Sequence, residues 1–224
     1  MNIQRFSGAV RVGSSFFSPL ENRLIGFIVP RLPKFIETYH LTLMTLPISA
    51  ALLAAAYLTR FSLNWLWLAS FIIVAQWFTD LLDGSLGRWR NTGLVRWGYY
   101  MDHFVDYIFL AAMLVGYTLV FPEANQFYFF LIFTTLSAFM VNSFLAFGAT
   151  HQFRIAFFGI GPTEVRLGFI FINTAIIFWQ PTSIDHVLLW LFGTFFLALV
   201  VIVYRIQQHI WELDKRNAAA ANPK

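Results

Sequence analysis

Long apolar runs separated by short polar stretches dominate the chain. A membrane-spanning helix takes about 20 apolar residues at 1.5 Å each. The sequence contains six such runs: Leu41–Thr59, Phe61–Leu82, Trp97–Phe121, Asn125–Ala149, Glu164–Trp179 and His186–His209. Within each run the apolar positions are continuous, whereas the strands of a membrane barrel alternate apolar and polar positions. The pattern therefore predicts six transmembrane helices.

A shorter pattern with one apolar side precedes these runs. Its apolar positions are Leu20, Leu24, Phe27 and Ile28, and its polar positions are Glu21, Asn22 and Arg23. Ser18-Pro19-Leu20-Glu21 predicts a capping box with proline in the first turn, and Pro30 and Pro33 predict the end of the helix. A helix of about three turns is too short to span a bilayer, so we expect it in the cytoplasmic interface. It would act there as an anchor or as a lip that guides lipid to a site.

Together these patterns predict an all-α membrane protein, with six transmembrane helices preceded by an N-terminal interfacial amphipathic helix. Residues 1–40 form the cytoplasmic or interfacial segment, residues 41–209 the six-helix transmembrane domain, and residues 210–224 a cytoplasmic tail. We see no internal repeat and no second domain.

Composition excludes several other classes. Hydrophobic residues make up 58% of the chain and charged residues 12%, against about 25% charged in soluble domains. This excludes a soluble enzyme, a disordered protein and a nucleic-acid-binding module. The net charge of +4 comes from residues that flank apolar runs, which indicates membrane topology and no nucleic-acid partner. Because the chain has no Cys, it has no thiolate metal site, cysteine nucleophile or disulfide.

The basic residues are distributed unevenly about the apolar runs. Of the 15 Lys and Arg residues, all except Arg60 fall on one face if the six runs alternate in direction. The positive-inside rule assigns this face to the cytoplasm. Both termini, residues 83–96 and residues 150–163 are therefore expected on the cytoplasmic side.

Four acidic residues lie where the second apolar run ends and the third begins: Asp80, Asp83, Asp102 and Asp106. Within each pair, spacings of three and four positions place the two carboxylates on one helix face. Four converging carboxylates repel one another, and burial in a bilayer adds a further penalty. Divalent cations would remove this conflict, and carboxylate oxygens favour Mg²⁺, Mn²⁺ or Ca²⁺. The alternative is that these acids pair with Arg88, Arg90 and Arg96 as a topology anchor.

These positions resemble the signature of the CDP-alcohol phosphotransferase family, DxxDGxxAR followed after a short spacer by GxxxDxxxD. The chain reads Asp80-x-x-Asp83-Gly84-x-x-Gly87-Arg88 and then Gly98-x-x-x-Asp102-x-x-x-Asp106. Gly87 replaces alanine, and the loss of a methyl group should still permit close helix packing. The six-helix plan with an amphipathic N-terminal helix extends the resemblance to most of the chain.

The resemblance implies an enzyme of phospholipid synthesis. A substituted phosphoryl group passes from a CDP-alcohol to an acceptor hydroxyl, and CMP is released. The resemblance implies that Mg²⁺ or Mn²⁺, as two ions, is held by Asp80, Asp83, Asp102 and Asp106, and that Asp106 is also the general base. It implies that Gly84 and Gly98 admit the nucleotide and that Arg88 holds its diphosphate. Two cations clamping the attacking and leaving oxygens suit this chemistry.

Other polar residues have less specific patterns. Gly161-Pro162-Thr163-Glu164 is typical of a helix start. Alternatively, a basic pocket for a lipid head group or an acceptor phosphate lies nearby, formed by His151, Arg154 and Arg166. His103 lies beside Asp102 but points to a different side of the helix, which favours a packing role, or a role in supporting a neighbouring side chain, over catalysis. Asn142 and Asn173 are expected to form interhelical hydrogen bonds.

The substrates and one alternative function stay open. The CDP-alcohol is CDP-diacylglycerol, with serine, inositol phosphate or glycerol phosphate as acceptor, or CDP-choline or CDP-ethanolamine, with diacylglycerol as acceptor. The alternative is a divalent-cation transporter, although transporter sites usually lie near the bilayer midplane. The expected partners are these substrates and membrane lipids. The family often forms dimers, and the residues neither support nor oppose a homodimer.

Overall fold

The computed structural model describes residues 10–12, 16–150, 152–154, 161–180 and 184–221. Its helices are α1 (Ser18–Ile28), α2 (Thr38–Leu58), α3 (Trp65–Arg90), α4 (Val95–Val120), α5 (Gln126–Thr150), α6 (Pro162–Trp179) and α7 (Asp185–Ala221). Single 3₁₀ turns, η1 (Val29–Arg31) and η2 (Glu123–Asn125), precede the connections into α2 and α5. Two strands, β1 (Val10–Val12) and β2 (Gln152–Arg154), complete the described elements.

Five of these helices are long and apolar enough to cross a membrane: α2, α3, α4, α5 together with η2, and α7. The predicted helix over residues 164–179 is present as α6, but it is not among the five. Its 18 residues include Glu164, Arg166 and Asn173, which lower its apolar content. Five of the six predicted transmembrane helices are therefore present as candidate membrane spans.

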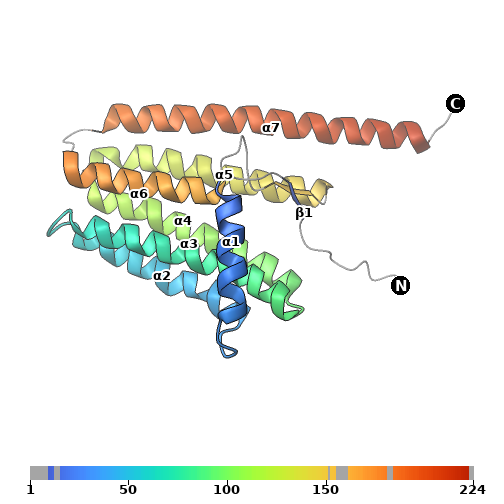
Figure 1. The fold of residues 1–224 in the computed structure, drawn as a ribbon. Helices are drawn as coiled ribbons and strands as arrows, with labels where there is room; N and C mark the ends of the chain where they lie inside the picture. Colours follow the sequence, from blue (N-terminus) through green and yellow to red (C-terminus); the bar gives the residue numbers. More distant parts are fainter. Residues whose placement is uncertain (1–9, 13–15, 151, 155–160, 181–183, 222–224) are drawn as a thin grey trace.

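The long helices α2 to α7 run side by side and alternate in direction (Figure 1). Helix α2 packs against both α3 and α4, α6 packs on α3, α5 on α4, and α7 on α5. Their shared core includes Leu66 and Ile73 from α3, Met113 from α4 and Phe169 from α6. One end of the bundle, termed here the α1 end, comprises residues 16–37, 90–95 and 161–166.

Helix α1 crosses the direction of the long helices at this end (Figure 1). Its predicted capping box is absent: the N-cap residue is Phe17, without a side-chain cap hydrogen bond. The carboxylate of Glu21 instead accepts a hydrogen bond of 2.5 Å from the hydroxyl of Thr163 on α6. A contact between residues so far apart in sequence overrides the local capping pattern, and it joins α1 to α6.

The segment between α1 and α2 is held against the end of α3. Val29 is buried against Leu82 and Leu86 of α3. The guanidinium of Arg90 donates hydrogen bonds to the carbonyl oxygens of Leu32 at 3.1 Å and Pro33 at 2.8 Å. Arg90 therefore satisfies backbone groups of a loop, and it does not join the acidic cluster.

The two strands are not predicted by the sequence pattern. Strands β1 and β2 pair in parallel, with Val10 opposite Gln152 and Val12 opposite Arg154. Three residues in each strand are too few to show a period of two, so backbone pairing alone reveals them. The all-α prediction is thus correct for the helices but misses this small sheet.

Candidate active site

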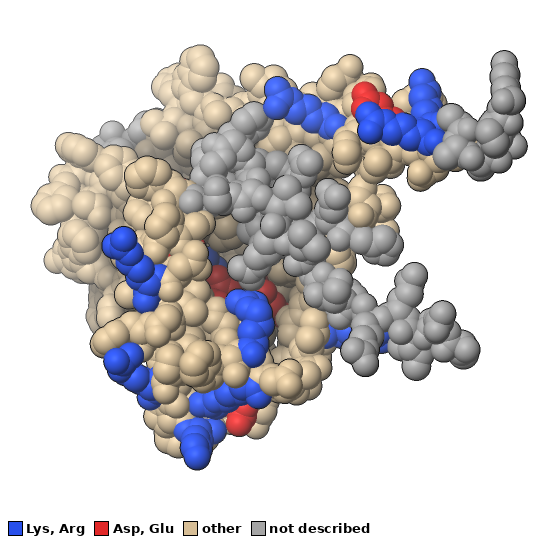
Figure 2. All heavy atoms as spheres, turned by 45° about the vertical axis from the view of Figure 1, so that its right-hand side comes forward, with Lys and Arg blue, Asp and Glu red and all other residues tan. Residues whose placement is uncertain are grey.

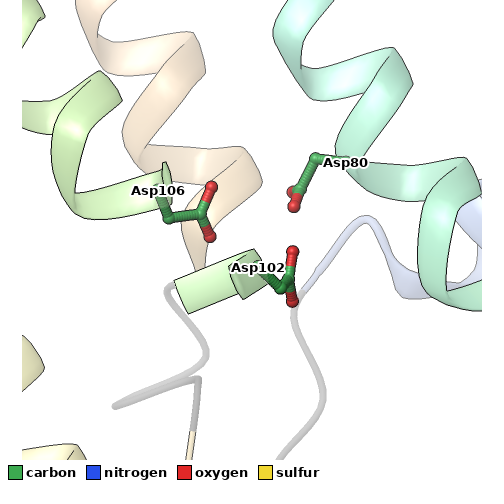
Figure 3. Close-up of side chains that lie close together, drawn as sticks. All are labelled: Asp80, Asp102 and Asp106. Atoms are coloured by element: carbon green, nitrogen blue, oxygen red, sulfur yellow. The ribbon is translucent and has the colours of Figure 1, made fainter. Parts of the chain in front are cut away.

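Three of the four predicted acidic ligands meet between α3 and α4. Asp80, Asp102 and Asp106 each place a carboxylate oxygen within 4.8 Å of the others. Figure 3 shows the three carboxylates directed at a common space, Asp80 from α3 and the other two from successive turns of α4. The chain reverses between these helices at Asn91 and Gly93, both with positive φ. This tight reversal brings the two halves of the sequence motif together.

Helix α6 contributes a cation to this acidic cluster. Nη2 of Arg166 lies 2.9 Å from Oδ2 of Asp80 and 3.5 Å from Oδ1 of Asp106. The Arg166 side chain is 9% exposed, so these ion pairs are largely shielded from solvent. From the sequence, Arg166 is a candidate for a basic pocket that binds a phosphate; in the structure it lies directly beside the acidic side chains.

Asp83 lies outside the group of three. Its Oδ2 accepts a hydrogen bond of 2.7 Å from the hydroxyl of Thr42 on α2, and its Oδ1 accepts one from the backbone N–H of Gly84. Asp83 is buried at 5% exposure. Three of the four carboxylates therefore converge as expected. The fourth, that of Asp83, faces α2.

The motif glycines differ in their surroundings. A Cβ at Gly98 would meet no atom of the described residues within 4 Å, so among these residues the space beside Gly98 is open. A Cβ at Gly87 would lie 3.1 Å from Oγ1 of Thr38, which is tighter than an ordinary contact. The glycine that replaces the motif alanine is therefore matched to a threonine on α2.

Arg88 lines a cavity between α1 and α3. This cavity, of about 470 Å³, is lined by α1 and α3 residues that include Asn22, Gly26, Ser85, Arg88 and Trp89. Nη2 of Arg88 donates a hydrogen bond of 3.0 Å to Oγ of Ser85. A Cβ at Gly84 would be 3.4 Å from Nη1 of Arg88, so Gly84 and Arg88 are close neighbours.

The remaining predicted residues have mixed outcomes. His151 lies outside the described residues, and Arg154 is described only by its backbone in β2. His103 packs against the rings of Tyr99 and Phe144, but its Nδ1 also lies 3.7 Å from Oδ2 of Asp102, so it does not point away from this carboxylate as the sequence suggested. Asn173 forms the expected interhelical hydrogen bonds. Nδ2 of Asn142 is buried without a hydrogen-bond partner among the described residues.

The N-terminus of α6 has the expected helix-start chemistry. Glu164 accepts hydrogen bonds from the backbone N–H of Gly161 at 2.8 Å and from that of Phe17 at 3.4 Å. Nε1 of Trp77 donates a hydrogen bond of 3.2 Å to the hydroxyl of Thr163. Residues of α1, α3 and α6 are therefore tied together one turn from Arg166.

One polar contact of the cluster was missed by sequence reasoning. Gln76 of α3 is fully buried, and its Nε2 donates a hydrogen bond of 3.2 Å to Oδ1 of Asp106. The signal was present, because an amide stands one helical turn before Asp80 in an apolar run.

The donor set fits a divalent cation. Three carboxylates within 4.8 Å repel one another when ionised, and Arg166 supplies only one compensating charge. Oxygen ligands of this type suit Mg²⁺, Mn²⁺ or Ca²⁺ better than softer metals. Figure 2 shows basic side chains spread over this side of the molecule with acidic side chains visible between them. The arrangement can bind a metal and attract an anionic substrate.

Comparison with known proteins supports this assignment of chemistry. The family model described as CDP-alcohol phosphatidyltransferase matches residues 32–208, which is well over half of the chain and includes the acidic cluster. A search of curated proteins found no match.

Proposed function

The chain belongs to the CDP-alcohol phosphatidyltransferase family of transferase enzymes. From this premise we propose that it transfers the substituted phosphoryl group of a CDP-alcohol to an acceptor hydroxyl, with release of CMP, in phospholipid biosynthesis. The observation that carries the proposal is the gathering of Asp80, Asp102 and Asp106 beside Arg166, within the segment that the family model covers.

The proposed cofactor is a pair of Mg²⁺ or Mn²⁺ ions. The residues that would hold it are Asp80, Asp83, Asp102 and Asp106; the short distances among three of them support this set. When bound, the cations neutralise charge on the diphosphate and on the leaving CMP. The carboxylate of Asp83 accepts hydrogen bonds from Thr42 and from the N–H of Gly84, and these fix the orientation in which it would bind a cation.

The residues of the chain then direct a displacement at phosphorus. The acceptor oxygen attacks the phosphorus that carries the alcohol, and the bond from this phosphorus to the oxygen of CMP breaks. CMP leaves with the bonding electron pair, and the hydroxyl proton passes to Asp106. The position of Asp106 supports this role, because Gln76 holds its carboxylate and the carboxylate lies within the cluster.

Several further residues bind the substrates in this proposal. Gly84 and Gly98 give the nucleotide room, since the space beside Gly98 is open. Arg88 holds the diphosphate from the rim of the cavity between α1 and α3. Arg166, together with His151 and Arg154, binds a lipid head group or an acceptor phosphate; the position of Arg166 beside the acidic cluster supports its part.

The proposal is tested by CMP release from the purified full-length protein in detergent. CDP-diacylglycerol, CDP-choline and CDP-ethanolamine are each offered with their acceptors, and product lipids are identified by mass spectrometry. We expect CMP and one lipid product with Mg²⁺ or Mn²⁺. EDTA should abolish turnover, because the carboxylates alone repel a diphosphate.

Two outcomes would contradict this proposal. Undiminished turnover in EDTA would remove the two-metal mechanism. Metal uptake into liposomes without CMP release from any CDP-alcohol would favour the transporter.

We further propose that the α1 end faces the cytoplasm. Glu123 and Asp185 lie at the other end of the bundle, where α4 leads to α5 and α6 leads to α7 (Figure 1). Single cysteines at these two positions should react with a membrane-impermeant reagent from outside the cell. Labelling only from the cytoplasmic side would overturn this orientation.

A further inference from the structure

A glutamine separates the acidic cluster from the apolar core. Gln76 is 0% exposed and precedes Asp80 by one turn of α3. Its Nε2 donates a hydrogen bond of 3.2 Å to Oδ1 of Asp106 on α4. In this contact the N–H₂ end of the amide faces Asp106, and the carboxylate oxygen accepts the hydrogen bond. Gln76 therefore holds the carboxylate that is proposed to be the general base.

The other end of this amide is unpaired. Oε1 of Gln76 is buried and accepts no hydrogen bond from the part of the chain that the structure describes. A buried carbonyl without a donor destabilises a folded protein. The preceding turn of α3 is apolar at Ile72 and Ile73, both buried. An apolar side chain of similar length at position 76 would avoid this penalty, so packing does not explain the amide.

A second buried amide in the same bundle shows the structural alternative. Oδ1 of Asn173 accepts a hydrogen bond of 2.7 Å from the hydroxyl of Tyr117, and Nδ2 donates one of 3.1 Å to Oγ of Ser70. Both ends of this amide are thus used to join helices. In Gln76, by contrast, the hydrogen bond goes to a charged group of the candidate site.

We propose that Gln76 is a positioning residue for Asp106. The inference rests on the proposed function, because it requires Asp106 to take the proton of the acceptor hydroxyl. By donating to Oδ1, Gln76 restricts rotation of the carboxylate and keeps it directed into the cluster before the acceptor binds. Loss of this contact lowers the rate of proton transfer and leaves the binding of the CDP-alcohol almost unchanged.

The first test replaces Gln76 with methionine, which is unbranched and of similar length but cannot donate. We expect Gln76→Met to lower single-turnover CMP release by about 10- to 100-fold, as loss of a partner behind a catalytic group does. The affinity for the CDP-alcohol and for Mn²⁺, both measured by calorimetry, should stay within about threefold of the wild type. The melting temperature in detergent should hold or rise, because the unpaired Oε1 is removed.

The matched control is Asn173→Leu, which removes a buried amide with two partners and no contact to the acids. This variant should lower the melting temperature and leave turnover of the folded protein unchanged. Gln76→Glu is a second probe, because it retains the size of Gln76 but places another carboxylate against Asp106. It should reduce turnover more than Gln76→Met does.

A double-mutant cycle tests whether Gln76 acts through Asp106. In an Asp106→Asn background, Gln76→Met should reduce turnover by less than about threefold, since the base is already lost. An undiminished effect in that background would overturn the proposal, as would wild-type turnover of Gln76→Met. A parallel fall of melting temperature and turnover would also overturn it, in favour of a structural role. Absence of CMP release by the wild-type protein would instead defeat the proposed function itself.

Discussion

Polar side chains of α3, α4 and α6 contact one another at two levels of the bundle. The group of side chains at one level is charged, and the group at the other level is neutral. Near the α1 end the three helices contribute Asp80, Asp106 and Arg166, which are joined by ion pairs. Deeper in the bundle they contribute Ser70, Tyr117 and Asn173, which are neutral and joined by hydrogen bonds. Ser70 precedes Asp80 by ten positions on α3, which is about 15 Å of helix.

The two levels also differ in how completely their polar atoms are paired with hydrogen-bond or ion-pair partners. At the deeper level, each of the three side chains, termed here the neutral trio, has a hydrogen-bond partner among the other two. At the α1 end, Asp102 brings a third carboxylate within 4.8 Å, and Oε1 of Gln76 is buried without a partner. The neutral trio satisfies its own polar groups, whereas the charged cluster gathers three carboxylates that could hold a metal ion.

The largest expected effect comes from removing carboxylates of the charged cluster. Asp80→Asn removes a charge that, in the proposed function, holds the cations, so metal-dependent nucleotide binding and turnover should both be lost. Asp83→Asn should resemble it. Asp106→Asn retains shape and one oxygen, so turnover should fall by about 10²–10⁴, the usual share of a general base. Nucleotide affinity, measured by calorimetry beside single-turnover CMP release, should fall much less in Asp106→Asn.

This pair of variants also separates a metal ligand from a base. Equal loss of nucleotide binding in Asp106→Asn and Asp80→Asn would make Asp106 mainly a ligand. The base would then have to be sought elsewhere, and the positioning role of Gln76 would fall with it.

A smaller effect is expected when the cation of the cluster is removed. Arg166→Leu should reduce turnover by about 10²-fold, because an anionic group of the substrate loses its partner. Mn²⁺ affinity should hold or rise, since the guanidinium no longer competes for Asp80. The control is Arg60→Leu, at the opposite end of the bundle, where Arg60 is exposed and bonded to Tyr57. A large loss of Mn²⁺ affinity in Arg166→Leu would show that Arg166 only organises the acids.

The fold was predictable where the signal was local. Continuous apolar runs predicted all of the long helices, because a long helix can be recognised from the residues of its own segment. The capping of α1 was wrong, since Glu21 bonds Thr163, whose position depends on how α6 packs. The pairing of β1 with β2 was missed for the same reason: residues 10–12 and 152–154 are distant in sequence.

The candidate site divides in the same way. Spacing on α3 and α4 was enough to place Asp80, Asp102 and Asp106 together, since a short connection forces the two helices to be neighbours. It did not reveal that Asp83 turns towards Thr42, because this depends on the packing of α2 against α3. The contact of Arg166 with Asp80 likewise depends on the docking of α6.

The smallest expected effect comes from the neutral trio, and it tests whether that trio is purely structural. Tyr117→Phe removes the hydroxyl that donates to Asn173 but retains the ring, which stacks on Phe129 and Phe169 at 5.9 Å between centroids. Interhelical hydrogen bonds of this kind contribute about 1 kcal/mol. We therefore expect a small fall in the free energy of unfolding in detergent.

The control for this variant is Tyr128→Phe, at a ring that packs against the same core. It should leave stability unchanged, because no hydrogen bond to its hydroxyl is seen within the described residues. Turnover per folded molecule should match the wild type in both variants, since neither ring touches the acids. If Tyr117→Phe reduced CMP release nearly as much as Asp106→Asn does, the neutral trio would also be required for activity. Unchanged turnover with lowered stability would instead show that the neutral trio is purely structural. The same three helices would then hold the active site at one level and a structural contact at the other.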